Sequence, residues 1–176
     1  DNYKAGYEIA RYMLECGYKN IGYVATTLEH EAHEWRAAKR SSGIYAAFRD
    51  ANRLEPLRQN VNNPLSIEEC GATAAEFVAA NPELDAIICS SEILGVGAIK
   101  ELHGRGWQIP EKISVAGIGD ANIASLVHPG LTTIKILGRK IGERSAEILL
   151  ERMQGFHDLA IQEDIGFQLV VRGSTK

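Results

Sequence analysis

The sequence lacks the features of membrane-spanning, secreted and disulfide-stabilised proteins. None of its apolar runs approaches the roughly 20 residues that a membrane-spanning helix needs, and no signal-like stretch is present. Cysteine is scarce, and Cys16, Cys70 and Cys89 make an odd number without Cys-x-x-Cys spacing. We therefore expect no disulfide framework and no membrane contact, and the sequence favours a reducing, cytoplasmic compartment.

Motifs for nucleotide chemistry and for hydrolysis are also missing. The segments GVGAIK and GIGDAN each have two glycines but lack the third glycine of a dinucleotide-binding loop, and no P-loop or Gly-x-Ser-x-Gly pattern occurs. Basic residues are not in excess, because 19 Lys and Arg stand against 23 Asp and Glu. The sequence thus predicts no cofactor, no enzymatic activity and no nucleic-acid contact by this segment itself.

Apolar runs do alternate with helical patterns, most clearly in LDAIICSSEILGVGAIKELHGRGWQIPEKISVAGIGD. Residues 85–90 and 113–118 are short apolar runs typical of buried strands, and residues 92–103 have the apolar spacing of a helix. Two such strands joined through a helix form a parallel βαβ unit. Polar residues follow both strands, at 90–92 and 119–120, so we expect a ligand site where these strand ends meet.

The remainder of the chain continues this alternation and predicts an α/β fold with a parallel sheet. A helix capped by Asp1 or Asn2 should end at Gly17, and the last helix should stop at Gly155. The other expected helices cover residues 35–51, 66–80 and 121–127, and the other expected strands lie within residues 20–26, 60–66, 131–136 and 164–172.

Six segments together carry a resemblance to a known family. They are DNYKAGYEIARYMLECGYKNIGYV, KRSSGIYAAF, the central stretch quoted above, HPGLTTI, IGERSAEILLERMQG and QLVVRGST. In order and spacing they resemble the effector-binding core of the LacI-GalR family of transcriptional repressors, and the ending DIGFQLVVRGST is similar to the gluconate-repressor branch. The resemblance implies a three-layer αβα, periplasmic-binding-protein-like type I fold that binds a small molecule between two lobes.

The same resemblance implies a division of the chain. Residues 1–135 would form the C-terminal effector-binding lobe, residues 136–164 would belong to the N-terminal lobe, and residues 165–176 would be a return strand and tail. The DNA-binding helix-turn-helix would lie outside this chain, which we expect to be part of a longer regulator. A homodimer is expected, with residues 92–103 and 123–128 at its interface.

Effector-binding residues are implied on two helices. Arg40 stands where the family places an arginine that holds a ligand hydroxyl or carboxylate, with Arg36 and Lys39 beside it in the run RAAKR. The alternative is a solvated arginine in a charged run. Ser91 matches a position that is commonly Asn, and Glu92 stands at the usual Asp. For Glu92 the alternative, an acid stabilised by the helix dipole, is the favoured interpretation.

A departure from the family concerns the end of the strand at residues 113–118. Many members have an Asp where this chain has Gly119, and here the acid comes one position later, at Asp120. Loss of a carboxylate opposite an arginine would favour an anionic ligand, such as a sugar acid. The alternative, with nearly equal weight, is a neutral sugar bound by Asp120 from a shifted loop.

The segment EHEAHE, residues 29–34, brings two histidines and four carboxylates together. It is not the His-Glu-x-x-His motif, and no remote third ligand is evident, so we expect a solvated acidic loop and no metal site. The function implied is ligand sensing by a transcriptional repressor that controls DNA binding allosterically. The alternatives are a periplasmic sugar-binding receptor of a transporter and a hydrolase that uses the EHEAHE side chains.

Overall fold

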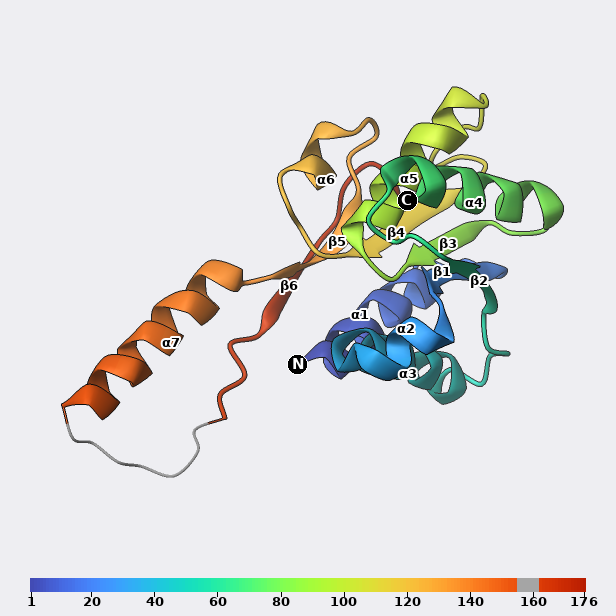
Figure 1. The fold of residues 1–176 in the computed structure, drawn as a ribbon. Coiled ribbons are helices and arrows are strands. Elements are labelled where there is room, and N and C mark those ends of the chain that lie inside the picture. Colours follow the sequence, from blue (N-terminus) through green and yellow to red (C-terminus); the bar gives the residue numbers. More distant parts are fainter. Residues whose placement is uncertain (155–161) are drawn as a thin grey trace.

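Six strands form a sheet at the centre of the computed structural model, which describes residues 1–154 and 162–176 (Figure 1). Across the sheet their order is β2-β1-β3-β4-β5-β6, and neighbouring strands run parallel except β5 and β6. The strands are β1 (Ile21–Thr26), β2 (Leu57–Val61), β3 (Ala86–Cys89), β4 (Ser114–Ile118), β5 (Thr132–Ile136) and β6 (Phe167–Val170).

Helices cover both faces of this sheet. On one face α1 packs against α3, and on the other α4 packs against α5. The helices are α1 (Asn2–Glu15), α2 (Leu28–His33), α3 (Trp35–Asp50), α4 (Ile67–Ala80), α5 (Glu92–Gly104), α6 (Ile123–Leu126) and α7 (Gly138–Met153). The predicted three-layer αβα fold is therefore confirmed.

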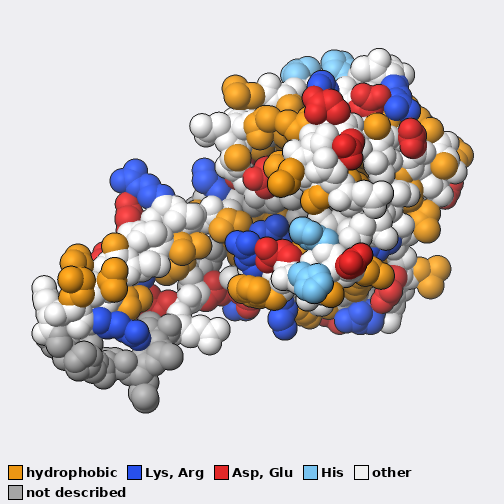
Figure 2. Space-filling model, in the orientation of Figure 1, with side chains coloured by type: hydrophobic (Ala, Val, Ile, Leu, Met, Phe, Trp, Pro, Cys, Tyr) orange, Lys and Arg blue, Asp and Glu red, His pale blue; other side chains and the backbone are white. Residues whose placement is uncertain are grey.

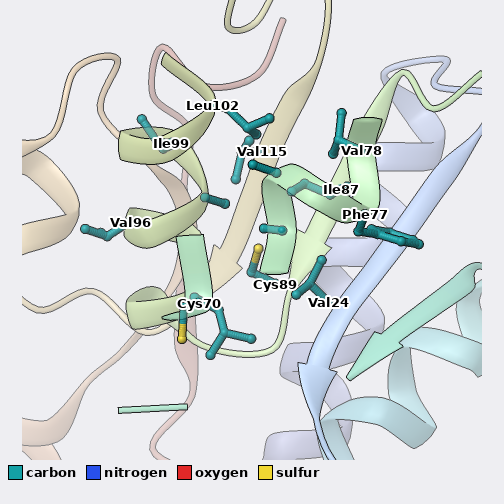
Figure 3. Packing of buried hydrophobic residues seen from close by; sticks show 14 of the residues in the cluster. Val24, Cys70, Phe77, Val78, Ile87, Cys89, Val96, Ile99, Leu102 and Val115 are labelled. Atoms are coloured by element: carbon teal, nitrogen blue, oxygen red, sulfur yellow. The ribbon is translucent and has the colours of Figure 1, made fainter. Parts of the chain in front are cut away.

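Two hydrophobic cores lie on opposite faces of the sheet because successive strand residues point to opposite sides. Ile87 belongs to the core under α4 and α5, and its neighbour Ile88 belongs to the core under α1 and α3. Figure 3 shows the first core, to which Ile87 and Cys89 of β3 and Ile99 of α5 all belong. Every residue of β1, β3 and β4 is buried, which explains why their sequences are nearly continuous apolar runs.

Helix α7 differs from the other long helices because none of its residues is buried. It projects from the body at the end of β5, and β6 leads back from it (Figure 1). Hydrophobic side chains lie along this arm (Figure 2), and Leu149, Leu150 and Met153 are all exposed. We use "the arm" for α7 and "the body" for residues 1–131 with their helices and strands.

Several predicted boundaries shift. Strand β2 begins at Leu57, before the range 60–66 predicted for it, and α7 begins at Gly138 rather than at Ile141. Strand β6 runs antiparallel because it returns from the arm. The predicted stop at Gly155 lies outside the described residues. Within the described part of the chain, none of the helices combines the length and the hydrophobicity required to cross a bilayer.

Candidate functional site

A hollow of about 600 Å³ lies at the carboxyl ends of three neighbouring strands. Thr26 ends β1, Asn63 follows β2 and Ser90 follows β3, and all three line the hollow. The amino-terminal part of α3 and the start of α5 complete its wall. Parallel α/β sheets bind ligands at this edge, so the structure provides a hollow where the sequence predicts a polar site.

Arg40 lies in the wall of this hollow and is held in place by two hydrogen bonds. Its Nε donates to Asn2 Oδ1 at 3.0 Å, and its Nη1 donates to the Ser90 carbonyl oxygen at 3.3 Å. Burial lowers the pKa of the Arg40 guanidinium, and the negative charge of Glu92 acts in the opposite direction. The Arg40 guanidinium nevertheless stays positively charged at neutral pH, because arginine does not lose its proton in proteins.

The tight crossing of α1 and α3 positions the Arg40 backbone. A Cβ on Gly6 would lie 2.9 Å from Arg40 Cα, so only a residue without a side chain fits there. Arg40 is therefore placed by the helix packing of the body and not by a mobile loop.

Arg36 and Lys39 have different surroundings from Arg40. Arg36 lines the hollow but pairs with Glu34, whose Oε2 lies 2.9 Å from Arg36 Nη2. Hydrogen bonds from the Arg36 side chain and backbone lower the pKa of Glu34 to about 2. Lys39 lies instead on a separate hollow beside Trp35. Of this basic run, the structure brings Arg36 and Arg40 to the hollow and leaves Lys39 outside it.

Ser91 and Glu92 both line the hollow at the start of α5. The Ser91 Oγ accepts a hydrogen bond from the Leu94 backbone N–H at 3.4 Å, so its side chain also caps the helix. No hydrogen bond or ion pair from residues 1–154 or 162–176 engages the carboxylate of Glu92. Its position in the first turn of α5 also suits the helix dipole, the interpretation that the sequence favours.

Asp120 does not line this hollow. Its side chain is 6% exposed, and Arg172 Nη2 lies 2.7 Å from its Oδ1, while Lys135 Nζ lies 3.4 Å from its Oδ2. The Arg172 contact is an ion pair without the alignment of a hydrogen bond. Asp120 thus ties the end of β4 to β5 and to the segment after β6, a contact that strand periodicity does not reveal.

The prediction of a solvated acidic loop at residues 29–34 is wrong about the loop and about Glu31, whereas residues 29, 30, 32 and 33 are exposed as expected. The segment forms α2, capped by Thr27, and Glu31 is buried beneath it. Glu31 Oε1 lies 2.9 Å from Arg58 Nη2 and accepts a hydrogen bond from Ser41 Oγ at 2.6 Å. The partly buried Arg58 on β2 draws this acid inward, whereas other charged and histidine side chains gather on the surface over α2 (Figure 2).

The sequence does not predict a role for two polar groups of this region. Arg58 is the cation beneath α2, and Thr26 has a buried Oγ1 without a hydrogen-bond partner among the described residues. A strand-end position is the only sequence signal for Thr26. Within the same residues, no group of three or more His, Cys, Asp or Glu side chains is arranged to hold a metal ion.

A mostly parallel sheet covered by helices on both faces, with a polar hollow at the carboxyl ends of its strands, defines a ligand-binding α/β domain. The sequence profile of the periplasmic binding protein-like domain matches residues 10–175. The chain therefore belongs to the periplasmic binding protein-like domain family.

Similar proteins agree with this assignment. The chain is 25% identical to the HTH-type transcriptional repressor CytR of Escherichia coli strain K12, covering 100% of the chain and 50% of the relative. It is 29% identical to the HTH-type transcriptional regulator GntR of Pseudomonas aeruginosa, covering 98% and 49%. The crystal structure of transcription regulator GntR from Chromobacterium violaceum matches with a TM-score of 0.88 and 29% identity, covering 99% and 63%.

These similarities confirm the resemblance to LacI-GalR repressors inferred from the six segments. The chain spans about half the length of the curated relatives it matches.

Proposed function

We propose that this chain is the effector-sensing part of a transcriptional repressor and that it binds a small sugar or sugar acid. The observation that carries the proposal is Arg40, a half-buried cation fixed in the wall of the hollow. Its Nη2 has no hydrogen-bond partner within the described residues, and the buried Thr26 Oγ1 also lacks one. A guanidinium N–H can only donate hydrogen bonds, so the free Nη2 of a cation held in the wall favours a ligand rich in oxygen acceptors.

The ligand class favoured by Arg40 is a sugar acid such as gluconate. A guanidinium makes charge-assisted hydrogen bonds with a carboxylate, and these are stronger than its bonds to neutral hydroxyls. Arg36 adds a second cation to the wall, although Glu34 neutralises much of its charge. Ser91 offers a hydroxyl at the same wall, while Lys39 and Asp120 take no direct part because they lie outside the hollow.

The proposal divides the chain into parts of two lobes. Residues 1–135 form the C-terminal lobe, residues 136–164 belong to the N-terminal lobe, and residues 165–176 return to the first lobe. The support is the arm, whose exposed apolar residues have no counterpart to pack against in the described chain. In this proposal the rest of the N-terminal lobe, from outside this sequence, covers that apolar surface and closes the ligand cleft.

Ligand binding acts on DNA at a distance in this proposal. An effector shifts the repressor only if it binds one arrangement of the lobes better than the other. The DNA contact belongs to a helix-turn-helix outside this chain, in a cytoplasmic homodimer without a cofactor. The two subunits of the proposed dimer meet through α5 and the segment 123–128. Leu126 in that segment is 80% exposed and would be covered by the partner. The two-fold axis of the dimer would coincide with the symmetry of a palindromic operator.

The test is a thermal-shift panel on the full-length protein with gluconate, other aldonates and the matching aldoses. We expect the acids to raise the unfolding temperature and Arg40→Ala to reduce that shift strongly. Lys39→Ala is the matched control, because it removes a cation from the same helix but outside the hollow, and it should leave the shift unchanged. Stabilisation by aldoses and not by aldonates would contradict the sugar acid, and an unchanged shift in Arg40→Ala would remove Arg40 from the site.

A further inference from the structure

Glu92 and Gly119 compete for the same space at the edge of the hollow. An ideal Cβ built on Gly119 would lie 2.5 Å from Glu92 Cδ and 3.1 Å from its Oε1, and it would lie closer still to Oε2. Gly119 also has φ +110°, a backbone conformation that residues with side chains rarely adopt. The absence of a side chain at position 119 therefore makes room for the Glu92 carboxylate.

This contact changes the charge argument drawn from the sequence. Glycine at position 119 removes a carboxylate from the end of β4, but α5 supplies another one at the same place. The hollow thus keeps a negative group, and its charge acts on the Arg40 guanidinium across the hollow wall. A ligand at this wall meets a cation and an anion together, and a simple anion would be attracted by one and repelled by the other.

We propose that Glu92 is a specificity-determining residue that accepts hydrogen bonds from ligand hydroxyls, and that Gly119 is a positioning residue that makes room for it. This inference rests on the proposed function. The ligand class that satisfies both charged groups is a polyhydroxylated carboxylic acid, with its carboxylate at Arg40 and a hydroxyl at Glu92. The carboxylate of Glu92 suits this role because the described residues leave its oxygens without a partner, and an ionised carboxylate only accepts hydrogen bonds.

Binding to the full-length protein tests the ligand role, with three probes measured by titration calorimetry. Gluconate has both groups, glucose has hydroxyls alone, and hexanoate has a carboxylate alone. We expect gluconate to bind most tightly and Glu92→Ala to weaken it about tenfold or more, because a hydrogen bond to a charged group is lost. Glu92→Gln, which keeps one acceptor oxygen and the shape, should lose less. Glu111→Ala, an acid outside the hollow, is the matched control and should bind as the parent does.

The glycine supplies a second measurement. In Gly119→Ala the added Cβ displaces the Glu92 carboxylate, so gluconate should bind about as weakly as to Glu92→Ala. Displacing this carboxylate costs little stability by itself, because it is the end of a flexible side chain without a partner among the described residues. The unfolding temperature should still fall, because φ +110° strains a residue with a side chain. The double variant Glu92→Ala/Gly119→Ala should bind gluconate no more weakly than Glu92→Ala, because the carboxylate is already absent.

The outcomes separate this inference from the proposed function. If gluconate binds the parent protein and Glu92→Ala binds it equally well, the inference fails while the effector site stands. If aldoses and aldonates do not bind the parent protein at all, the proposed function fails, and with it the ligand role of Glu92. Gluconate binding by Gly119→Ala that is as tight as that of the parent protein would overturn the role assigned to Gly119.

Discussion

Helices α1 and α7 have similar apolar patterns and very different surroundings. In the body, α1 buries Ala5, Ile9 and Met13 completely between α3 and the sheet. In the arm, α7 leaves Leu149 and Met153 exposed and buries no residue. An amphipathic pattern therefore states that a helix has an apolar side, and only the rest of the fold supplies what covers that side.

The body should depend strongly on the Glu31–Arg58 ion pair, whereas the ion pairs of the arm among the described residues are mostly exposed. In the 176-residue chain, Glu31→Ala removes the carboxylate that pairs with Arg58 under α2. Breaking a buried pair costs roughly 3–5 kcal/mol, and we expect about 3 kcal/mol because Arg58 keeps hydrogen bonds to Asn60, Tyr45 and Thr26. Glu143→Ala removes the exposed partner of Arg139 on α7 and should cost about 0–1 kcal/mol. Denaturant unfolding measures the loss of unfolding free energy in each variant. Equal losses would contradict the expectation that ion pairs contribute more to the body than to the arm.

Truncation of a hydrophobic side chain makes the same comparison without charge. Ile88 is fully buried in β3, so Ile88→Ala should lower the free energy of unfolding by about 2–5 kcal/mol. Leu149 is 60% exposed, and Leu149→Ala in the same chain should change the free energy of unfolding by less than about 0.5 kcal/mol.

The same substitution in the proposed longer regulator tests whether the N-terminal lobe covers the arm. If the N-terminal lobe covers the arm as proposed, Leu149→Ala should cost clearly more in full-length protein than in the 176-residue chain. An equally small loss of unfolding free energy in both proteins would show that the apolar side of the arm is not covered by the N-terminal lobe.

Glycine substitutions should have opposite signs in the two regions. Gly6→Ala places a Cβ against the Arg40 backbone, and such overpacking typically costs about 1–3 kcal/mol. A Cβ added at Gly142 in α7 would meet no neighbouring group within 4 Å, and alanine favours a helix over glycine by up to about 1 kcal/mol. Gly142→Ala should thus leave stability unchanged or raise it, as measured by thermal unfolding.

Thiol reactivity gives the smallest and simplest test of the body's packing. Cys16 is exposed, whereas burial raises the pKa of the Cys70 thiol to about 11 and raises that of the Cys89 thiol further. Because the thiolate is the reactive form, a raised pKa means fewer thiolates at pH 8. A thiol reagent should label Cys16 quickly and the other two only after unfolding. Rapid labelling of Cys89 would show that the core under α5 opens readily.

Prediction from the sequence succeeded where a pattern reports on the backbone. The apolar runs at β1, β3 and β4 are long enough and continuous enough to define strands buried on both faces, and glycines and polar caps mark most helix ends. Strand β2 was harder, because it lies at the sheet edge and LRQNV has one buried residue, Val61. The family resemblance likewise lies in the six segments themselves, without reference to the fold.

The sequence by itself determined the alternation of strands and helices, the edge of the sheet that carries polar residues, and the presence of Arg40 and Glu92 there. The tertiary structure alone decided which charges meet. Asp120 pairs with Arg172, Glu31 with Arg58, and the Glu92 carboxylate lies over Gly119. The physical reason is that a charge takes its partner from whatever packing places within a few ångströms, and residues distant in sequence give no local signal of that proximity.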